Sequence, residues 1–222
     1  MSAAEQDSER QADDRLLHRL LFFSDAVFAI VLTLLVLELR PPETHDASSL
    51  ASALGDMSDH FFAFGMSFAL VAVFWAAHMT ILRRLALFDW PTAWANLLFL
   101  APVCLTPFAS SLLGRGAFGP AAWVVYSCVL IATSAAMLIL WLTASRGGGR
   151  LLGGISGRER AYRGLRAASP GLAFGAGLVV LHMGYLRLAQ NCWVLIPTVY
   201  VLAALLLKPK SPKAAAAASD AD

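Results

Sequence analysis

One carboxylate, Asp25, lies inside an apolar segment that is long enough to cross a membrane. The segment covers residues 19–37, reads RLLFFSDAVFAIVLTLLVL, and meets no further charge until Glu38. At about 1.5 Å of rise per helical residue, it can span the hydrocarbon core of a bilayer. A charge at the centre of a membrane helix costs about 2.5–3.5 kcal/mol on insertion scales. We therefore expect Asp25 to face protein or water rather than lipid, and to have a partner.

His78 and Asn96 are the candidate partners of Asp25, because both are expected near the same membrane face. Trp75 lies one helical turn before His78 and is expected to pack nearby. Arg19 precedes Asp25 by six residues, a spacing that does not place the two side chains on one helix face. Arg19 would then reach Asp25 by a bent path or meet another helix. We interpret these residues as a structural network that holds the first helix in place.

No other pattern indicates catalysis, a cofactor or a metal site. The five histidines show no H-E-x-x-H spacing, and a lone histidine within the membrane is typical of a structural donor. Cys104, Cys128 and Cys192 fall inside apolar runs without a C-x-x-C motif, and are interpreted as small buried hydrophobic residues. Ser24 beside Asp25 is not a hydrolase arrangement without a base in reach. The sequence favours no enzyme.

The composition is that of an all-α integral membrane protein. Hydrophobic residues make up 58% of the chain and charged residues 14%, whereas soluble domains have about 25% charged residues. The mean hydropathy is +0.64. Hydropathy predicts six membrane-spanning helices, over residues 15–39, 60–82, 91–113, 121–145, 168–186 and 188–207. Pro41 and Pro42 should end the first helix, and Pro102 and Pro107 should kink the third.

Polar segments connect and flank these helices, so that one membrane domain is predicted over residues 15–207. Residues 1–14 are interpreted as a disordered tail, with a helical extension of the first span as the alternative. Residues 208–222 are low in complexity and predicted to be disordered. The polar loop at 43–59 includes a short amphipathic helix at 47–57, and a glycine-rich basic linker covers 146–166. The fifth and sixth helices form a tight hairpin.

The distribution of basic residues predicts the orientation in the membrane. Fourteen of the 17 fall in the N-terminal segment, the connections after the second and fourth helices, and the C-terminal tail: Arg10, Arg15, Arg19, Arg83, Arg84, Arg146, Arg150, Arg158, Arg160, Arg163, Arg166, Lys208, Lys210 and Lys213. Arg40, Arg115 and Arg187 fall on the other side. Since loops rich in Lys and Arg stay in the cytoplasm, both termini are predicted to be cytoplasmic. The basic linker is thus a topology signal and not a nucleic-acid site.

Arg19, Phe23, Ser24 and Asp25 form the string R-x-x-x-F-S-D at the head of the first membrane helix. With the apolar run that follows, this string resembles the first helix of the transmembrane protein 175 family of potassium channels. It is most similar to the prokaryotic branch, which has one six-helix unit per chain. Segment 67–85, with Trp75 and His78, and segment 94–108, with Asn96, are similar to the second and third helices of the family. The resemblance covers about residues 15–114.

The resemblance implies a potassium-selective homotetramer in the lipid bilayer of the cell membrane, expected to be the bacterial cytoplasmic membrane, whose first helix lines a central pore. The sequence has no T-V-G-Y-G filter, so the family pattern implies a hydrophobic constriction at Ile30, a hydroxyl ring at Thr33, and a stripe continued by Leu34 and Leu37. A ring of branched apolar residues can gate by dewetting. By the residues alone, the apolar ones could instead pack against neighbouring helices, and Thr33 could bond back to the carbonyl of Ala29.

Two other function classes remain open from the sequence. A proton-coupled secondary transporter would use Asp25 and His78, and six helices could divide into two repeats of three, although the halves show no convincing similarity. A non-conducting membrane scaffold is the third class. No span carries the series of arginines that voltage sensors require, so a channel would be independent of voltage. No cofactor is implied, and no metal beyond the permeating potassium.

Overall fold

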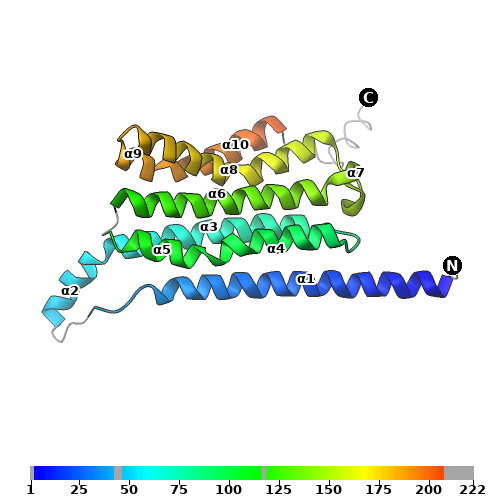
Figure 1. The fold of residues 1–222 in the computed structure, drawn as a ribbon, viewed down its shortest axis with the longest axis horizontal. Helices are drawn as coiled ribbons and strands as arrows, with labels where there is room; N and C mark the ends of the chain where they lie inside the picture. Colours follow the sequence, from blue (N-terminus) through cyan, green and yellow to red (C-terminus); the bar gives the residue numbers. More distant parts are fainter. Residues whose placement is uncertain (1–2, 43–46, 117–118, 208–222) are drawn as a thin grey trace, which may run out of the picture.

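The protein is a bundle of long helices that lie side by side (Figure 1). The structure is a computed structural model and describes residues 3–42, 47–116 and 119–207. Within these residues, six helical segments are long and apolar enough to cross a membrane. The six-helix all-α architecture predicted from hydropathy is confirmed. The tail at 208–222 lies outside the described residues.

The first three spans are α1, α3 and the broken pair α4–α5. The remaining spans are α6, α8 and a final span made of short pieces. The complete order is α1 (Ala3–Leu37), α2 (Ala47–Asp56), α3 (Ser58–Leu82), α4 (Trp90–Cys104), α5 (Thr106–Gly114), α6 (Gly119–Ala144), α7 (Arg146–Gly149), η1 (Arg150–Leu152), α8 (Gly157–His182), α9 (Leu186–Gln190), η2 (Cys192–Val194) and α10 (Leu195–Leu207).

The spans are layered roughly in chain order. In Figure 1, α1 forms one edge of the bundle, α3, α4 and α5 come next, α6 follows, and α8, α9 and α10 form the opposite edge. α1 packs against α3, α4 and α5, whereas α6 packs against both α4 and α8. α6 is therefore the centre of the core, and α1 is covered on one side only.

Proline determines where the third span breaks. Pro102 lies inside α4 and Pro107 at the start of α5, and the two helices meet at Leu105. Proline lacks the backbone N–H and its ring clashes with the preceding turn, so a continuous helix is disrupted there. The kink predicted from these two prolines is confirmed. At the other end, the Asp89 side chain caps α4 by accepting a hydrogen bond from the Thr92 backbone N–H at 2.9 Å.

Three predicted boundaries differ from the structure. Residues 3–14 are part of α1, so the helical extension holds rather than the disordered tail. The predicted linker at 146–166 is wrong in its second half, because α8 begins at Gly157, where the Ser156 hydroxyl accepts from the Glu159 N–H at 3.2 Å. The sixth span is divided into α9, η2 and α10. The short helix predicted at 47–57 is confirmed as α2.

The buried core lies mainly along α6. Trp123, Tyr126 and Trp141 of α6 are fully buried, and Trp123 and Tyr126 pack on Phe174 of α8 with ring centroids 5.7 and 5.8 Å apart. All three cysteines are unpaired, as expected. Only Cys192 is buried, however, since Cys104 and Cys128 lie on the outer surface of the bundle.

Candidate functional site

One narrow stripe fastens α1 to the rest of the chain. Ser24, Phe28, Val31 and Leu35 recur every three or four residues and are at most 2% exposed. This spacing places them on one face of the helix. They pack against α3, α4 and α5. α1 therefore has a defined inner side, and the residues on the opposite side of the helix point away from the bundle.

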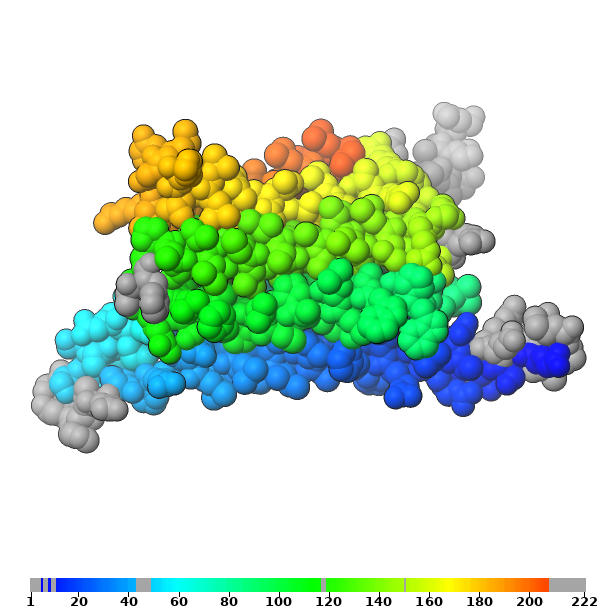
Figure 2. All heavy atoms as spheres, in the orientation of Figure 1, coloured from blue at the N-terminus to red at the C-terminus, as the bar shows by residue number. Residues whose placement is uncertain are grey.

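The four residues predicted to form a constriction all lie on the uncovered side of α1. Ile30 is 58% exposed, Leu34 42% and Leu37 68%, and Thr33 is exposed as well. In Figure 2 the atoms of α1 form one whole edge of the molecule. None of these four side chains packs into the bundle of its own chain. They form a continuous outward stripe about 10 Å long from Ile30 to Leu37, at 1.5 Å per residue.

The Thr33 hydroxyl bonds back to its own helix. Its Oγ1 donates to the carbonyl oxygens of Ala29 and Ile30, at 3.0 and 2.8 Å. The back-bonding that the sequence left open is therefore present. The hydroxyl oxygen itself remains on the exposed side of α1.

A buried chain of hydrogen bonds joins α1, α4 and α3. The Asn96 side-chain amide donates to Ser24 Oγ at 2.9 Å, and Ser24 Oγ donates to the carbonyl of Leu20 at 2.8 Å. The Asn96 carbonyl oxygen lies 2.6 Å from His78 Nε2. Because that oxygen can only accept, His78 Nε2–H is the donor. Ser24, His78 and Asn96 are 0–1% exposed, so these hydrogen bonds lie in the buried interior of the bundle.

Aromatic rings enclose the histidine in this chain. The His78 ring stacks on Phe99 of α4 at a centroid distance of 5.3 Å, and Phe28 of α1 lies 5.5 Å away at a tilt. In the described part of the chain, no group of three His, Cys, Asp or Glu side chains could hold a metal ion. The contacts of His78 are those of a packed structural donor.

Asp25 is not a member of this hydrogen-bond chain, which corrects the predicted network, although it bonds to Trp75 of the same predicted set. Asp25 is exposed, and its Oδ1 accepts a hydrogen bond from Trp75 Nε1 at 3.0 Å. Ser24, and not Asp25, bonds to Asn96. Arg19 is exposed and forms no hydrogen bond or ion pair with any residue that the structure describes. Phe23 of the same string is 51% exposed.

A second buried polar cluster was missed by the sequence reasoning. Ser67 Oγ of α3 donates to Ser110 Oγ of α5 and lies 3.0 Å from the Tyr126 hydroxyl of α6. Ser110 Oγ in turn donates to the carbonyl of Ala63 at 3.2 Å. The three residues come from three separate apolar spans. Their only signal in the sequence is polarity within a membrane helix.

Charged contacts close the end of the bundle at which α1 begins. Glu159 pairs with Arg84 and, at 3.1 Å, with Arg163, while Asp89 pairs with Arg146. Partial burial of the Asp89 carboxyl would raise its pKa, but the two hydrogen bonds from Thr92 and the Arg146 guanidinium lower it and prevail. These contacts tie together the connections that follow α3 and α6.

A family comparison identifies the same segment that carries the site. The family model described as the endosomal/lysosomal potassium channel TMEM175 matches residues 19–107. These residues contain the outward stripe of α1, the Ser24–Asn96–His78 chain and Trp75.

Individual relatives extend the match. A potassium channel from Chamaesiphon minutus is 31% identical over 186 residues, which cover 82% of this chain and 88% of the relative. One from Streptomyces collinus is 32% identical over 130 residues, and the match spans only 63% of that relative. The Bos taurus protein named endosomal/lysosomal proton channel TMEM175 is 33% identical over 155 residues, which are 32% of its length.

A solved structure shares the fold. The crystal structure of a lysosomal potassium-selective channel TMEM175 homolog from Chamaesiphon minutus superposes with a TM-score of 0.67 at 27% identity, and the match covers 85% of this chain and 98% of that chain. The family predicted from the R-x-x-x-F-S-D string is thereby confirmed, and it is a family of ion channels and not of enzymes. The chain is a multi-pass membrane protein and belongs to the TMEM175 family.

Proposed function

We propose that this chain is a potassium-conducting cation channel that assembles as a homotetramer around a pore lined by the outward stripe of α1. The observation that carries the proposal is the position of Ile30, Thr33, Leu34 and Leu37, all of which face away from their own bundle. The names of the relatives support potassium as the ion, since three bacterial relatives are named potassium channels.

The uncovered side of α1 is poorly suited to lipid alone. Asp25 lies within the membrane-spanning part of α1, is exposed, and accepts one hydrogen bond, from Trp75. A carboxylate that faced hydrocarbon would be costly, so such residues face bundle interiors or water-filled cavities. A homotetramer with α1 at its centre would provide both a bundle interior and a water-filled cavity, because neighbouring copies and an aqueous pore would replace lipid along α1.

Ile30 is proposed as the narrowest ring of the pore. Four branched apolar side chains around an axis exclude loosely held water and require an ion to shed part of its hydration. Thr33 would place an oxygen ring one turn further, and Leu34 and Leu37 would continue the apolar lining. The sequence has no T-V-G-Y-G filter that could do this with backbone carbonyls.

The proposed orientation places both termini in the cytoplasm. The start of α1 and the connection at α7 lie at the same end of the bundle (Figure 1). That end carries the ion pairs of Arg84, Arg146 and Arg163. Lys and Arg in short connections favour the cytoplasmic side. A cysteine label at Ser156 would then react only from the cytoplasm.

Substitution of Ile30 by asparagine tests the pore. Ile30→Asn should raise single-channel conductance and weaken the preference for potassium over sodium, because a polar ring no longer excludes water. The measurement is single-channel recording in planar bilayers, with reversal potentials under a potassium–sodium gradient.

Val36→Asn is the matched control, since Val36 is also exposed on α1 but lies off the stripe. Native mass spectrometry confirms that both variants assemble as tetramers. An assembled Ile30→Asn tetramer with unchanged conductance and selectivity would remove Ile30 from the pore.

The proton-coupled transporter using Asp25 and His78 gains no support from the geometry. No hydrogen bond joins these two side chains among the residues described, because Asp25 bonds to Trp75 and His78 to Asn96. The same recordings separate the classes, since only a channel shows unitary currents.

A further inference from the structure

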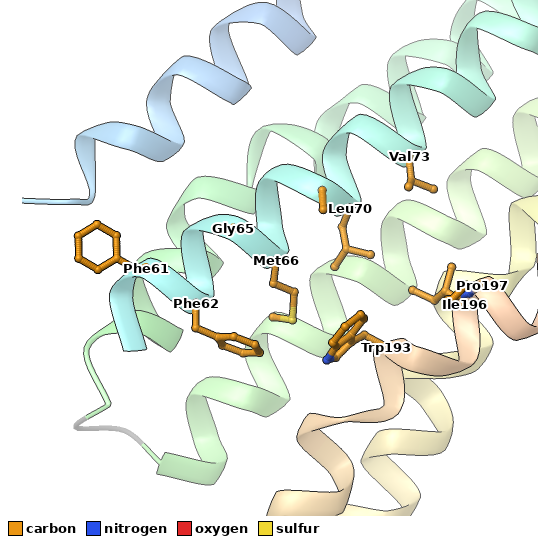
Figure 3. A pocket seen from close by; sticks show the side chains of 10 residues that line it. Phe61, Phe62, Gly65, Met66, Leu70, Val73, Trp193, Ile196 and Pro197 are labelled. Atoms are coloured by element: carbon orange, nitrogen blue, oxygen red, sulfur yellow. The ribbon is translucent and has the colours of Figure 1, made fainter. Parts of the chain in front are cut away.

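An apolar hollow opens on a side of α3 that α1 does not cover. The hollow has a volume of about 460 Å³ and is lined by α3 residues between Phe61 and Val73, and by Trp193, Ile196 and Pro197 from the final span. Figure 3 shows Met66 and Leu70 pointing toward Trp193 across the hollow. Its size is within the range of small-ligand sites, and its lining is almost entirely apolar.

The same face of α3 continues to a second, basic hollow, which is much smaller at about 20 Å³. That hollow is lined by Ala77, Thr80 and Ile81 of α3 and by Arg163, Arg166 and Ala167 of α8. The α3 positions 66, 69, 73, 77 and 80 are spaced by three or four residues, so they form one stripe. We call this stripe, with the facing walls of α8 and α10, the α3 furrow.

Tyr200 lies near both hollows on the opposite wall, although it lines neither of them. It lies one turn after Pro197 on α10, and the Arg166 guanidinium stands 4.5 Å from the centre of its ring. The apolar hollow and the arginines therefore follow one another along α3, and we treat them as one furrow. A ligand that fits both parts has an apolar length and a polar end.

The charges at the basic end are not balanced. Arg84 and Arg163 share the single carboxylate of Glu159. Arg166 has no carboxylate partner within residues 3–42, 47–116 and 119–207, and its guanidinium lies against the tyrosines Tyr162 and Tyr200. A guanidinium has five N–H donors in a planar fork that suits phosphate. The basic end of the furrow is therefore complementary to an anion with phosphate geometry.

The near end of the apolar hollow lies within one membrane leaflet of the basic end. Along α3, the hollow begins at Val73, about 10 Å from Thr80, and extends to Phe61, about 29 Å from Thr80, at 1.5 Å per residue. Half of the hydrocarbon core of a bilayer is about 15 Å thick. An acyl chain whose head group lies at Thr80 and Arg166 would thus enter the near end of the apolar hollow.

We propose that the α3 furrow binds an anionic phospholipid, with its phosphate at Arg163 and Arg166 and an acyl chain in the apolar hollow. Basic pockets between membrane helices on the cytoplasmic side are suited to such head groups. The proposal depends on the placement of the chain in a membrane and does not require that it conducts ions.

The head-group contact is tested with the purified full-length protein and two lipids of equal chain length. Native mass spectrometry measures the affinity for phosphatidylglycerol and for phosphatidylcholine. Arg166→Gln should lower the affinity for phosphatidylglycerol about fivefold, the equivalent of about 1 kcal/mol for one basic residue at an anionic surface, and leave phosphatidylcholine unchanged. Arg160→Gln is the matched control, because Arg160 is exposed on the same helix, does not line the furrow, and has no carboxylate partner in the described chain.

The acyl-chain contact is tested by filling the hollow. Ala69→Trp should lower the affinity for both lipids, since Ala69 lines the apolar hollow. Val201→Trp is its control, because Val201 is 58% exposed on α10 and does not line the hollow. Circular dichroism verifies that all variants keep their helix content.

Three results would overturn the proposal. Equal losses in Arg166→Gln and Arg160→Gln would show diffuse surface attraction only. Displacement of phosphatidylglycerol by inorganic phosphate at equal concentration would identify a free-anion site without a role for the acyl chain. Phosphatidylglycerol that stays bound to dissociated monomers but is absent from the tetramer in native mass spectra would show that a neighbouring copy covers the furrow. None of these measurements reads ion flux, so they fail or succeed independently of the proposed channel.

Discussion

α1 and α6 are both long apolar helices, yet they differ in how much of their surface the rest of the chain buries. α6 is enclosed, and Trp123, Tyr126 and Trp141 along it have no exposed surface. α1 contains the most apolar stretch of the six described spans, but it buries only the stripe from Ser24 to Leu35. In a membrane, apolar character favours insertion and does not by itself drive helices together. The difference teaches that hydropathy finds both helices, while only the packing shows that α1 is covered by its own chain on one side alone.

Substitution of Trp141 should produce the largest effect and test the enclosed half of this comparison. Trp141→Ala leaves a cavity in the core and removes the hydrogen bond from Trp141 Nε1 to the Arg160 carbonyl. Such truncations cost about 3–5 kcal/mol in well-packed cores. Thermal unfolding of the purified protein is the measurement. Leu142→Ala is the control, since its side chain is 44% exposed and should change stability by less than about 0.5 kcal/mol. Equal effects at both positions would mean that α6 is not the centre of the core.

Substitution of His78 should have an intermediate effect on stability, and it tests the buried side of α1. His78→Ala leaves the Asn96 carbonyl without its donor, which costs about 1–3 kcal/mol when the group is buried. Ser24→Ala acts on the same Asn96 side chain, so the double variant should lose less than the sum of the two single losses.

Asp25→Asn serves as the comparison within this series. Asp25 shares no hydrogen-bond partner with His78, so Asp25→Asn should couple to His78→Ala more weakly than Ser24→Ala does. Additive losses for Ser24 with His78, or a stronger coupling of Asp25 than of Ser24 with His78, in thermal unfolding would contradict these two sets of contacts.

Acid should weaken the connection between α3 and α4, where Asp89 caps α4, more than it weakens α1. The pKa of Asp89 is lowered in the folded state, so its contribution is present above its ordinary pKa and is lost as the pH falls through the lowered value. The loss should be about 1 kcal/mol, typical of a helix N-cap. Thermal unfolding of wild type and Asp89→Asn at pH 7 and below pH 4 is the measurement, and the difference between them should shrink in acid. A difference that is the same at both pH values would exclude this role of the carboxylate.

The smallest expected effect on stability is at the outward stripe of α1. Leu34→Thr changes a side chain that is 42% exposed and touches little of its own chain, so stability should shift by less than about 0.5 kcal/mol. Ion flux through liposomes should change in the same variant. A stability loss as large as that of Trp141→Ala would show that the stripe is packed and not open.

The six spans could be predicted because the length of an apolar run indicates a membrane span and proline indicates a break in a helix. Pro102 and Pro107 marked the break in the third span correctly. The start of α8 was missed although Ser156 and Glu159 form an S-x-x-E capping pattern, because glycine and arginine around it suggested a linker. The local signal was present, and the overall composition concealed it.

The polar contacts could be predicted only in part. The sequence brought Ser24, Asp25, His78 and Asn96 together, but it could not tell which of two neighbours faces inward. Adjacent helical residues differ by about 100° in direction, and the rotation of α1 is set by how Phe28 and Leu35 pack. The Ser67–Ser110–Tyr126 cluster is formed by three separate helices, so no residue spacing within one helix predicts it.

The bond from Thr33 to its own helix has a consequence for the sign of the ions that the proposed pore admits. A hydroxyl whose proton is shared between the Ala29 and Ile30 carbonyls offers only its oxygen lone pairs to the outside. Four such oxygens around an axis would give an ion acceptors but no donors. Chloride, which needs N–H or O–H groups, would find nothing to replace its lost water there, whereas a cation would. The proposed pore would then prefer cations over anions although its lining carries no formal charge. The preference would come from the direction of the four Thr33 hydroxyl dipoles.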